Sequence, residues 1–462
     1  MTQDFAQQLL ATLGPDLVAL GADIPPRYHH DWAGLPPVTP LALVRPRRTE
    51  DVVALMRLCH AAGVPVVPQG GLSGISGAAH PRADAVALSL DRMNRIESVD
   101  PQAAQIVAEA GVVLEVAQMA ARDQGMLLGI DIGARGSCQL GGVIATNAGG
   151  NTVIRYGMAR DHVLGLEVVL ADGTVISDMA GLIKNNAGMD LKQLFIGSEG
   201  LLGIVTRCIL RLQPAPRAIE TALCAVADTQ GALALLAHLR GALGPQLSSF
   251  EVMWPSFYNV MAPGAGIALP LPPRGPHVLV EATGFSDTAL REGIEEALGE
   301  ALEQGIVSDA ILAKSAQEGR GLWAVRESVS EYPVILGPLV PFDVSIPLKA
   351  MAETVALIEA GIAARWPGAR ALTYGHIGDN NLHLVVALPD PADHAAEKAL
   401  KGFVYDAIRD AGGTVSAEHG IGAIKRDYLG HSRTAAEIAL MRAIKATLDP
   451  KGILNPGKGF AA

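Results

Sequence analysis

Three glycine-rich runs constrain the fold of this 462-residue chain more than any other feature of its sequence. The first spans residues 71–77 and follows an expected strand at 64–67, and the others span 136–150 and 197–203. Glycine permits positive φ and close backbone approach, so successive N–H groups can converge on a phosphate. The first run reads G-x-x-G-x-x-G, not the dinucleotide fingerprint G-x-G-x-x-G. One such run is as consistent with a turn as with a ligand cradle, but three in one domain favour a surface for a flat polar ligand.

The spacing of apolar residues predicts an α+β fold. Apolar residues recur at helical spacing after Thr49, which we expect to cap a helix that Gly63 ends. Gln213-Pro214-Ala215-Pro216 marks a domain boundary. Strands are expected at 85–90, 105–108, 163–170 and 204–212 before it and at 219–226 and 277–283 after it, with later helices at 228–243 and 287–304. The chain is thereby divided into an N-terminal helical lead-in (1–37), two α+β domains (38–216 and 217–412) and a C-terminal segment (413–462).

Composition narrows the functional classes. The net charge of −11 disfavours nucleic acid and anionic membranes as partners. Four cysteines without a C-x-x-C pair are typical of free thiols in a reducing compartment. The sequence shows neither a secretory signal nor 18 uninterrupted apolar residues. We expect a cytoplasmic protein and leave peripheral attachment at the inner membrane open.

Histidines and a carboxylate gather in two short segments near the C-terminus. His376 and His383 are seven residues apart, so on one straight strand they would face opposite sides. They converge only if the intervening Gly378-Asp379-Asn380-Asn381 forms a turn; otherwise one imidazole is buried and the other is at the surface. Glu418 and His419 are adjacent on an extended segment and therefore point apart. Glu418 can complete a divalent-metal site with the two histidines, and His419 then remains for proton transfer.

These motifs resemble the flavin-dependent family of the vanillyl-alcohol oxidase type, whose FAD fold is that of p-cresol methylhydroxylase. Within it the chain most resembles the D-2-hydroxyacid dehydrogenases: D-lactate and D-2-hydroxyglutarate dehydrogenases and the glycolate oxidase flavin subunit. Besides the histidine motifs, the matching stretches within residues 38–460 are 67–71, 145–150, 155–157, 165–173, 190–200 and 455–458. The resemblance implies a two-part FAD-binding domain, an α+β substrate (cap) domain and a C-terminal segment that packs back on the FAD domain.

The resemblance also implies where FAD binds. Its pyrophosphate would lie on the 69–77 loop and its ring system near 141–150 and 199–204. The implied contacts are Gln69, Gly70, Gly71, Leu72, Ser73, Gly74, Ser76, Gly77, Gly136, Ser137, Gly141, Gly142, Thr146, Asn147, Gly149, Gly150, Glu199, Gly200, Gly203, Ile204 and Asn455. Leu72 stands where the family often carries Asn, which removes one polar contact, and the loop has no His for a covalent flavin link.

The same resemblance implies the chemistry. His376, His383 and Glu418 would hold Zn²⁺, with Mn²⁺ as the alternative, and His419 would be the base. A small anionic D-2-hydroxy acid would chelate the metal, lose its hydroxyl proton to His419 and pass its Cα hydride to flavin N5. Arg326 offers a fork for a carboxylate, and Ser330, expected one helical turn further on, would help to bind substrate. Reduced FAD would pass electrons to a quinone, a cytochrome or an electron-transfer flavoprotein.

Two departures bear on the substrate. Pro341 stands near the position where members specific for a second carboxylate tend to carry Lys, and Val385 stands where Asn is common. Both remove polar contacts to a distal carboxylate. They favour D-lactate, although the first-domain motifs most resemble the D-2-hydroxyglutarate branch.

Two other functions remain open at this point. A metal-dependent hydrolase would use the His/Glu cluster but leave the glycine runs unexplained. A non-catalytic flavin subunit of a larger complex would not need His419. A homodimer is compatible with the sequence.

Overall fold

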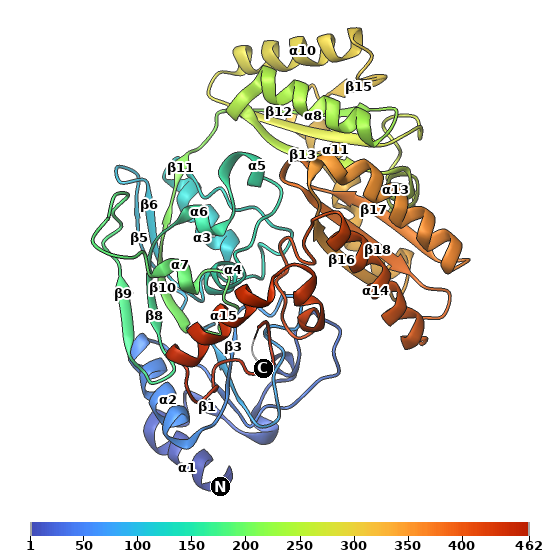
Figure 1. Ribbon diagram of the computed structural model, residues 1–462. Coiled ribbons are helices and arrows are strands. Elements are labelled where there is room, and N and C mark those ends of the chain that lie inside the picture. Colours follow the sequence, from blue (N-terminus) through green and yellow to red (C-terminus); the bar gives the residue numbers. More distant parts are fainter. Residues whose placement is uncertain (1, 461–462) are drawn as a thin grey trace. The chain divides into compact units, whose positions relative to one another are not determined.

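The computed structural model describes residues 2–460 and divides them into two units (Figure 1). The first contains residues 2–149, 157–215 and 418–460, and the second contains 150–156 and 216–417. Both mix helices and sheets, which confirms the α+β fold class. Residues 1, 461 and 462, at the ends of the expected lead-in and C-terminal segment, lie outside the described part. The sequence had predicted 38–216 as one domain, but the structure groups 150–156 with the second unit.

The first unit is built on two sheets. A four-stranded sheet has the order β1-β2-β4-β3, in which β2, β4 and β3 are parallel. A five-stranded antiparallel sheet has the order β5-β6-β10-β8-β9. Their strands are β1 Val18–Ala19, β2 Ala42–Val44, β3 Val66–Gln69, β4 Val86–Ser89, β5 Ile96–Asp100, β6 Gln105–Glu109, β8 Val163–Val169, β9 Val175–Asp178 and β10 Ile204–Arg211. A large apolar core contains residues of both sheets and of the helices packed on them.

Short elements complete the first unit. The helices are α1 Thr2–Leu13, α2 Thr49–Ala62, α3 Leu114–Asp123, α4 Leu140–Thr146, α6 Ala159–His162, α7 Lys192–Phe195 and α15 Ala435–Leu448, and β7 Met126–Leu127 pairs with β11 Gln213–Pro214. Gly63, with φ of +68°, ends α2 as predicted.

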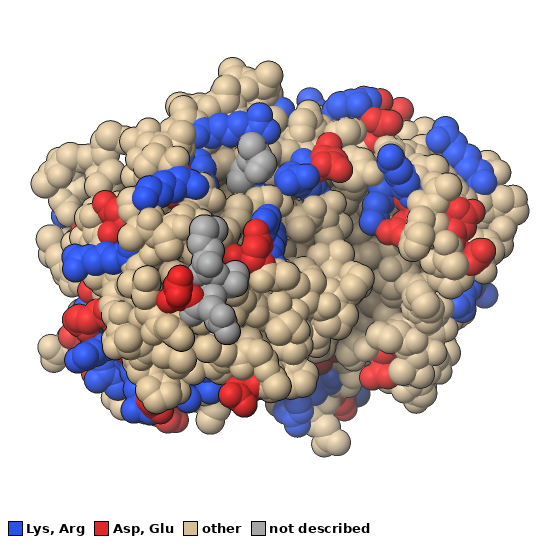
Figure 2. Space-filling model, turned by 90° about the horizontal axis from the view of Figure 1, so that it is seen from below, with Lys and Arg blue, Asp and Glu red and all other residues tan. Residues whose placement is uncertain are grey.

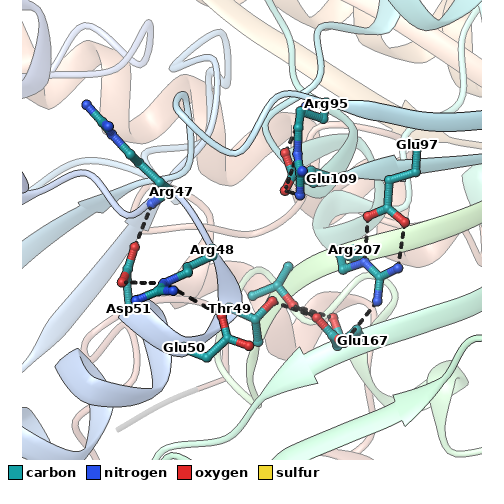
Figure 3. A network of polar contacts seen from close by, with 11 residues as sticks. Arg47, Arg48, Thr49, Glu50, Asp51, Arg95, Glu97, Glu109, Glu167 and Arg207 are labelled. Atoms are coloured by element: carbon teal, nitrogen blue, oxygen red, sulfur yellow. Dashed lines mark hydrogen bonds and ion pairs between the residues drawn. The ribbon is translucent and has the colours of Figure 1, made fainter.

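Thr49 does not cap α2, contrary to our prediction. The N-cap residue is Arg48, which makes no side-chain cap bond. Instead, the Thr49 hydroxyl donates to Glu167 Oε1 at 2.6 Å, and Glu167 also accepts from Arg207 (Figure 3). Arg207 pairs in turn with Glu97 at 2.6 Å. The hydroxyl is thus used to join α2 to the five-stranded sheet.

The second unit is built on one antiparallel sheet of order β15-β12-β14-β13-β17-β18-β16 (Figure 1). The strands are β12 Ala218–Ala225, β13 Leu247–Met253, β14 His277–Gly284, β15 Asp309–Leu312, β16 Val340–Ser345, β17 Arg370–Gly375 and β18 Asn381–Ala387. Helices α9 Pro255–Gly264 and α11 Ala316–Glu327 pack on one face around an apolar cluster. The other helices are α5 Val153–Tyr156, α8 Thr229–Leu243, α10 Asp287–Glu303, α12 Tyr332–Ile335, α13 Leu348–Arg365 and α14 His394–Asp410.

The surface and the cysteines agree with the composition. Basic and acidic side chains are interspersed on the face drawn in Figure 2. All four cysteines are buried free thiols. Within residues 2–460, no helix combines the length and the apolar character needed to cross a membrane.

Candidate functional site

The three glycine runs meet in the first unit, around the end of β3. Gly70 follows β3 directly, Gly141 and Gly142 lie in α4, and Gly200 and Gly203 precede β10. Together they line a cavity whose other walls are mainly small or apolar residues. The rest of the lining is Pro68, Gln69, Ala78, Ala79, Leu90, Ala110, Ala145, Thr146, Phe195, Ser198, Glu199, Ile204 and Val205. Glycines of the second and third runs, together with Gly70 just before the first run, therefore line one site in this unit.

Close backbone approach explains Gly71, in the first run, and Gly200, in the third. A Cβ at Gly71 would lie 1.9 Å from the carbonyl oxygen of Ser137, and one at Gly200 would lie 2.5 Å from Pro68 Cγ. Neither neighbour can move away cheaply, because each belongs to the chain's own tight packing. By contrast, a Cβ at Gly74 or Gly142 would meet no atom of the described residues within 4 Å. The first pair holds the runs together, and the second pair leaves space beside the backbone.

Buried polar atoms around this cavity also fit a polar ligand. Gln69 is buried and donates its side-chain N–H groups to Tyr28 O and Ala79 O, but its Oε1 accepts no hydrogen bond within the described chain. The same holds for Gln139 Oε1 and Asn455 Oδ1. Buried acceptors are normally satisfied, so these atoms indicate that a donor-bearing group binds here. The residues present thus fit the expected FAD.

Glu199 connects this cavity to the segment after His419. It adopts a left-handed conformation with φ of +52° and is buried. Its two carboxylate oxygens accept from Ile421 N and Gly422 N, each at 2.7 Å. Burial raises the pKa of Glu199, and these two N–H donors act in the opposite direction. Asn455 donates to the carbonyl oxygen of Glu199 at 2.8 Å, which brings the C-terminal motif to the same place.

The remaining predicted cofactor contacts lie in both units, and two of the non-glycine residues among them have a left-handed backbone conformation. Leu72 has φ of +60°, and Asn147, with φ of +50°, ends α4 and accepts from Arg160 N. Gly150 belongs to the second unit. The others, Ser73, Ser76, Gly77, Gly136, Ser137, Thr146 and Gly149, lie in the first unit.

The two predicted histidine ligands converge in the second unit. His376 follows β17, a 3₁₀ turn spans Ile377–Asp379, and Asn380 reverses the chain with φ of +75°. His383 lies on the next strand, β18, and the two ring centroids are 5.1 Å apart. Both residues are buried, at 6% and 7% exposure. The turn expected from the sequence is confirmed, and the reading with one surface imidazole is wrong.

A buried ion cluster surrounds His376. Glu251 on β13 accepts from His376 Nδ1 at 2.5 Å through Oε1 and from Arg326 Nε at 2.9 Å through Oε2. The Arg326 guanidinium lies over the ring of Tyr374, 4.5 Å from its centroid. Burial opposes the charge on Glu251, but His376 and Arg326 outweigh it and hold the pKa of this carboxyl below its ordinary value. Arg326 is therefore part of a buried network.

Asp343 is a second carboxylate beside the histidines. It lies directly opposite His383 in the β16–β18 pair and is 1% exposed. Its Oδ2 accepts from the hydroxyl of Ser416 at 3.2 Å. Glu418 and His419 follow two and three residues later, as the first residues of the last segment of the first unit.

Ser330 does not lie where the sequence predicted. Helix α11 ends at Glu327, and Ser330 lies in the 3₁₀ turn Ser328–Glu331. Its hydroxyl is exposed and donates to Glu327 O at 3.2 Å, whereas Arg326 is buried. The helical spacing assumed for the pair is therefore wrong, and a substrate role for Ser330 stays a prediction.

Sequence reasoning missed Glu251, Asp343 and Tyr374 as neighbours of the histidines. A usable signal existed for Glu251, the only charged residue in the strand sequence LSSFEVM. A charge inside a buried strand is costly unless it is paired, so its position predicts a buried partner.

Comparisons with known proteins agree with this arrangement. A family model described as "FAD linked oxidases, C-terminal domain" matches residues 215–459, and an FAD binding domain model matches residues 40–178. The mitochondrial D-2-hydroxyglutarate dehydrogenase of Bos taurus is 38% identical over 429 residues, which cover 93% of this chain and 78% of that protein. The D-2-hydroxyglutarate dehydrogenase of Xanthomonas citri pv. viticola is 38% identical over 440 residues, covering 94% and 92%.

A solved structure extends the comparison to the fold. Substrate-bound p-cresol methylhydroxylase superposes with a TM-score of 0.82 at 18% identity, covering 99% of this chain and 96% of that one. At this identity the likeness concerns the fold alone. It confirms the expected combination of an FAD-binding domain with a second α+β domain.

Proposed function

Because this chain belongs to the family of FAD-linked oxidases, and is thus an FAD-dependent oxidoreductase, we propose that it oxidises a D-2-hydroxy acid to the 2-oxo acid with the help of a divalent metal. One observation carries the proposal. His376 and His383 are buried, their rings are 5.1 Å apart, and an arginine suited to a carboxylate shares their network. Two imidazoles and an arginine fit a chelating 2-hydroxy acid.

The proposed metal ligands are His376, His383 and Glu418. Because His376 Nδ1 bonds to Glu251, a metal would bind this imidazole through Nε2. Glu418 follows Ser416 by two residues, so their Cα atoms are at most about 7 Å apart. Because Ser416 binds Asp343, opposite His383, this short link supports Glu418 as the third ligand. Such a set with an open position suits Zn²⁺, with Mn²⁺ as the alternative, and a bound metal would supply Lewis-acid chemistry.

The chain's own residues then have separate roles. Arg326 uses Nε for Glu251, which leaves its two Nη groups to bind a substrate carboxylate. His419 accepts the proton of the substrate hydroxyl, a task that an imidazole can perform as a general base. Bound FAD would supply the acceptor for the hydride.

D-2-Hydroxyglutarate is the first candidate substrate, because the cattle and Xanthomonas relatives are named for it. Pro341 and Val385 instead favour a substrate without a second carboxylate, such as D-lactate. They are direct cross-strand neighbours on β16 and β18. Both polar contacts would therefore be missing from the same part of the sheet. The electron acceptor stays a prediction: a quinone, a cytochrome or an electron-transfer flavoprotein. A cytoplasmic location, with or without peripheral attachment at the inner membrane, also stays a prediction, since the cattle relative is named mitochondrial.

The test uses purified holoprotein and a panel of D- and L-2-hydroxy acids under anaerobic conditions. D-2-Hydroxyglutarate or D-lactate should bleach the flavin absorbance, and the L-enantiomers should not. A chelator should abolish turnover with a dye acceptor and leave bound FAD in place, and Zn²⁺ or Mn²⁺ should restore it. His419→Gln should lower kcat by about 10²–10⁴-fold while FAD and metal contents stay at wild-type levels.

Two outcomes would contradict the proposal. Turnover that is insensitive to chelator in metal-free protein would remove the metal from the mechanism. Flavin-free protein that hydrolyses esters or amides would support the hydrolase, which the FAD-domain match disfavours.

A further inference from the structure

We propose that Glu251 is a positioning residue that couples metal binding to substrate binding, an inference that rests on the proposed function. One carboxylate contacts both the imidazole of a proposed metal ligand, His376, and the guanidinium of the proposed substrate-binding residue, Arg326. It is separated from them in sequence by 125 and 75 residues. The link therefore exists only in the folded second unit.

The bond to His376 determines which ring nitrogen can bind a metal. An ionised carboxylate only accepts hydrogen bonds, so His376 Nδ1 carries the proton and Nε2 presents its lone pair. Such a partner also fixes the ring orientation and raises the basicity of the imidazole. The same carboxylate also accepts from Arg326 Nε at 2.9 Å, so both of its oxygens are held in place.

The bond to Arg326 fixes the other partner. Glu251 Oε2 takes Nε, and Tyr374 lies under the guanidinium plane, so two contacts define its orientation. Glu251 therefore holds the guanidinium through Nε and does not bond to its Nη groups. A single carboxylate thus orients a metal ligand and a carboxylate fork together, so a change at Glu251 should affect both.

A glutamine at this position cannot satisfy both partners while His376 Nδ1 carries the proton. Its amide oxygen can accept from His376 Nδ1 or from Arg326 Nε, but its NH₂ group then faces the other donor. Aspartate keeps the charge but is one methylene shorter, so it cannot span both contacts. Both variants preserve much of the side-chain volume and limit the damage to packing.

Glu281 provides a matched control. It lies on β14, next to β13 in the same sheet, and accepts from Trp323 Nε1 at 2.8 Å. Trp323 belongs to α11, the helix that also carries Arg326. Glu281→Gln therefore makes the same substitution on the neighbouring strand, at a partly buried carboxylate, without touching either contact of Glu251.

The experiment measures Zn²⁺ affinity by competition with a chelating dye, on FAD-loaded protein stripped of metal. Glu251→Gln should weaken Zn²⁺ binding about 10–100-fold, the usual effect of losing an outer partner of a metal-bound histidine. Its KM for D-2-hydroxyglutarate should rise as well. Glu251→Asp should show a reduced affinity too, and Glu281→Gln should bind Zn²⁺ like the wild type. Thermal unfolding of each metal-free protein shows whether folding accounts for the loss.

The outcomes separate this inference from the proposed function. Wild-type Zn²⁺ affinity in both Glu251 variants would overturn the inference and leave the function intact. Weaker Zn²⁺ binding in Glu251→Gln, with no D-2-hydroxy acid oxidised by the wild type, would retain the metal-positioning role and overturn the function. A wild-type protein that binds no Zn²⁺ or Mn²⁺ would overturn both.

Discussion

Glu199 accepts a hydrogen bond from the backbone N–H of Gly422 at 2.7 Å, across 223 residues of sequence. Its second oxygen accepts from Ile421 N at the same distance. Glu199 lines the candidate flavin cavity, and His419 immediately precedes this loop. A Cβ at Gly420 would lie 2.9 Å from Glu199 Oε1, so the loop fits closely against the carboxylate. Within the first unit, the cavity wall and the proposed base are therefore mechanically connected.

Glu199→Gln should destabilise the first unit. The amide can accept from only one of the two N–H groups, and its own NH₂ then opposes the other. Leaving a buried donor unsatisfied costs about 1–3 kcal/mol, which denaturant unfolding of the FAD-loaded protein can measure. Glu359→Gln is the control, because Glu359 accepts one hydroxyl bond that an amide oxygen can retain. Equal stabilities of the two variants would contradict the role of the paired acceptors.

Gly71→Ala and Gly74→Ala should fail in different ways. The methyl group at Gly71 would overlap the carbonyl oxygen of Ser137, so the apoprotein itself should be destabilised. At Gly74 the methyl meets no described atom within 4 Å, so the apoprotein should keep its stability and lose affinity for FAD. Thermal unfolding without FAD and FAD titration distinguish the two. Wild-type FAD affinity in Gly74→Ala would exclude this part of the loop from the cradle.

Local pattern was sufficient for much of the fold. The helix that Gly63 ends, and the reversal between His376 and His383, depend on residues that are neighbours in sequence. The convergence of the glycine runs could be inferred because each run needs close backbone approach. Such needs are visible in the sequence, since only glycine satisfies them.

Contacts between distant strands could not be predicted in the same way. Glu251 meets His376 because β13 lies beside β17 in the sheet, and strand order is not visible in a local pattern. The hydroxyl of Thr49 could cap a helix, but in the structure it donates to the charged carboxylate of Glu167 instead. In both cases the tertiary structure determines which partner the side chain contacts.

Pro341→Lys should change substrate preference. Pro341 is exposed on β16, an edge strand where proline is tolerated, and lies on the same face as Asp343 and opposite Val385. A lysine there would offer a charge to a distal carboxylate. A hydrogen bond to a charged group contributes about 1.5–3 kcal/mol, so the kcat/KM ratio of D-2-hydroxyglutarate to D-lactate should rise at least about tenfold. Pro341→Gln, which adds length without charge, is the control. An unchanged ratio would mean that a distal carboxylate lies elsewhere.

Lys458 should make stability depend on pH above neutrality. It is 4% exposed and donates to Ala78 O and His80 O, and burial lowers its pKa to about 8, against the pull of Asp31 and Glu199. Below that pH, both the folded and unfolded states hold the proton and this group gives no slope. Between pH 8 and 10.5 the folded state has lost the proton and the unfolded state has not. The free energy of unfolding should therefore rise with pH in this window.

The contribution of Lys458 can be isolated with Lys458→Met. The difference in unfolding free energy between wild type and variant should grow by roughly 3 kcal/mol from pH 7.5 to 10.5, since one pKa unit corresponds to about 1.4 kcal/mol. Denaturant unfolding at half-unit pH steps measures this difference, and other titrating groups cancel in it. Lys451→Met, at an exposed lysine, is the matched control. A difference that stays constant with pH would show that Lys458 keeps its proton throughout, and that Asp31 and Glu199 outweigh its burial.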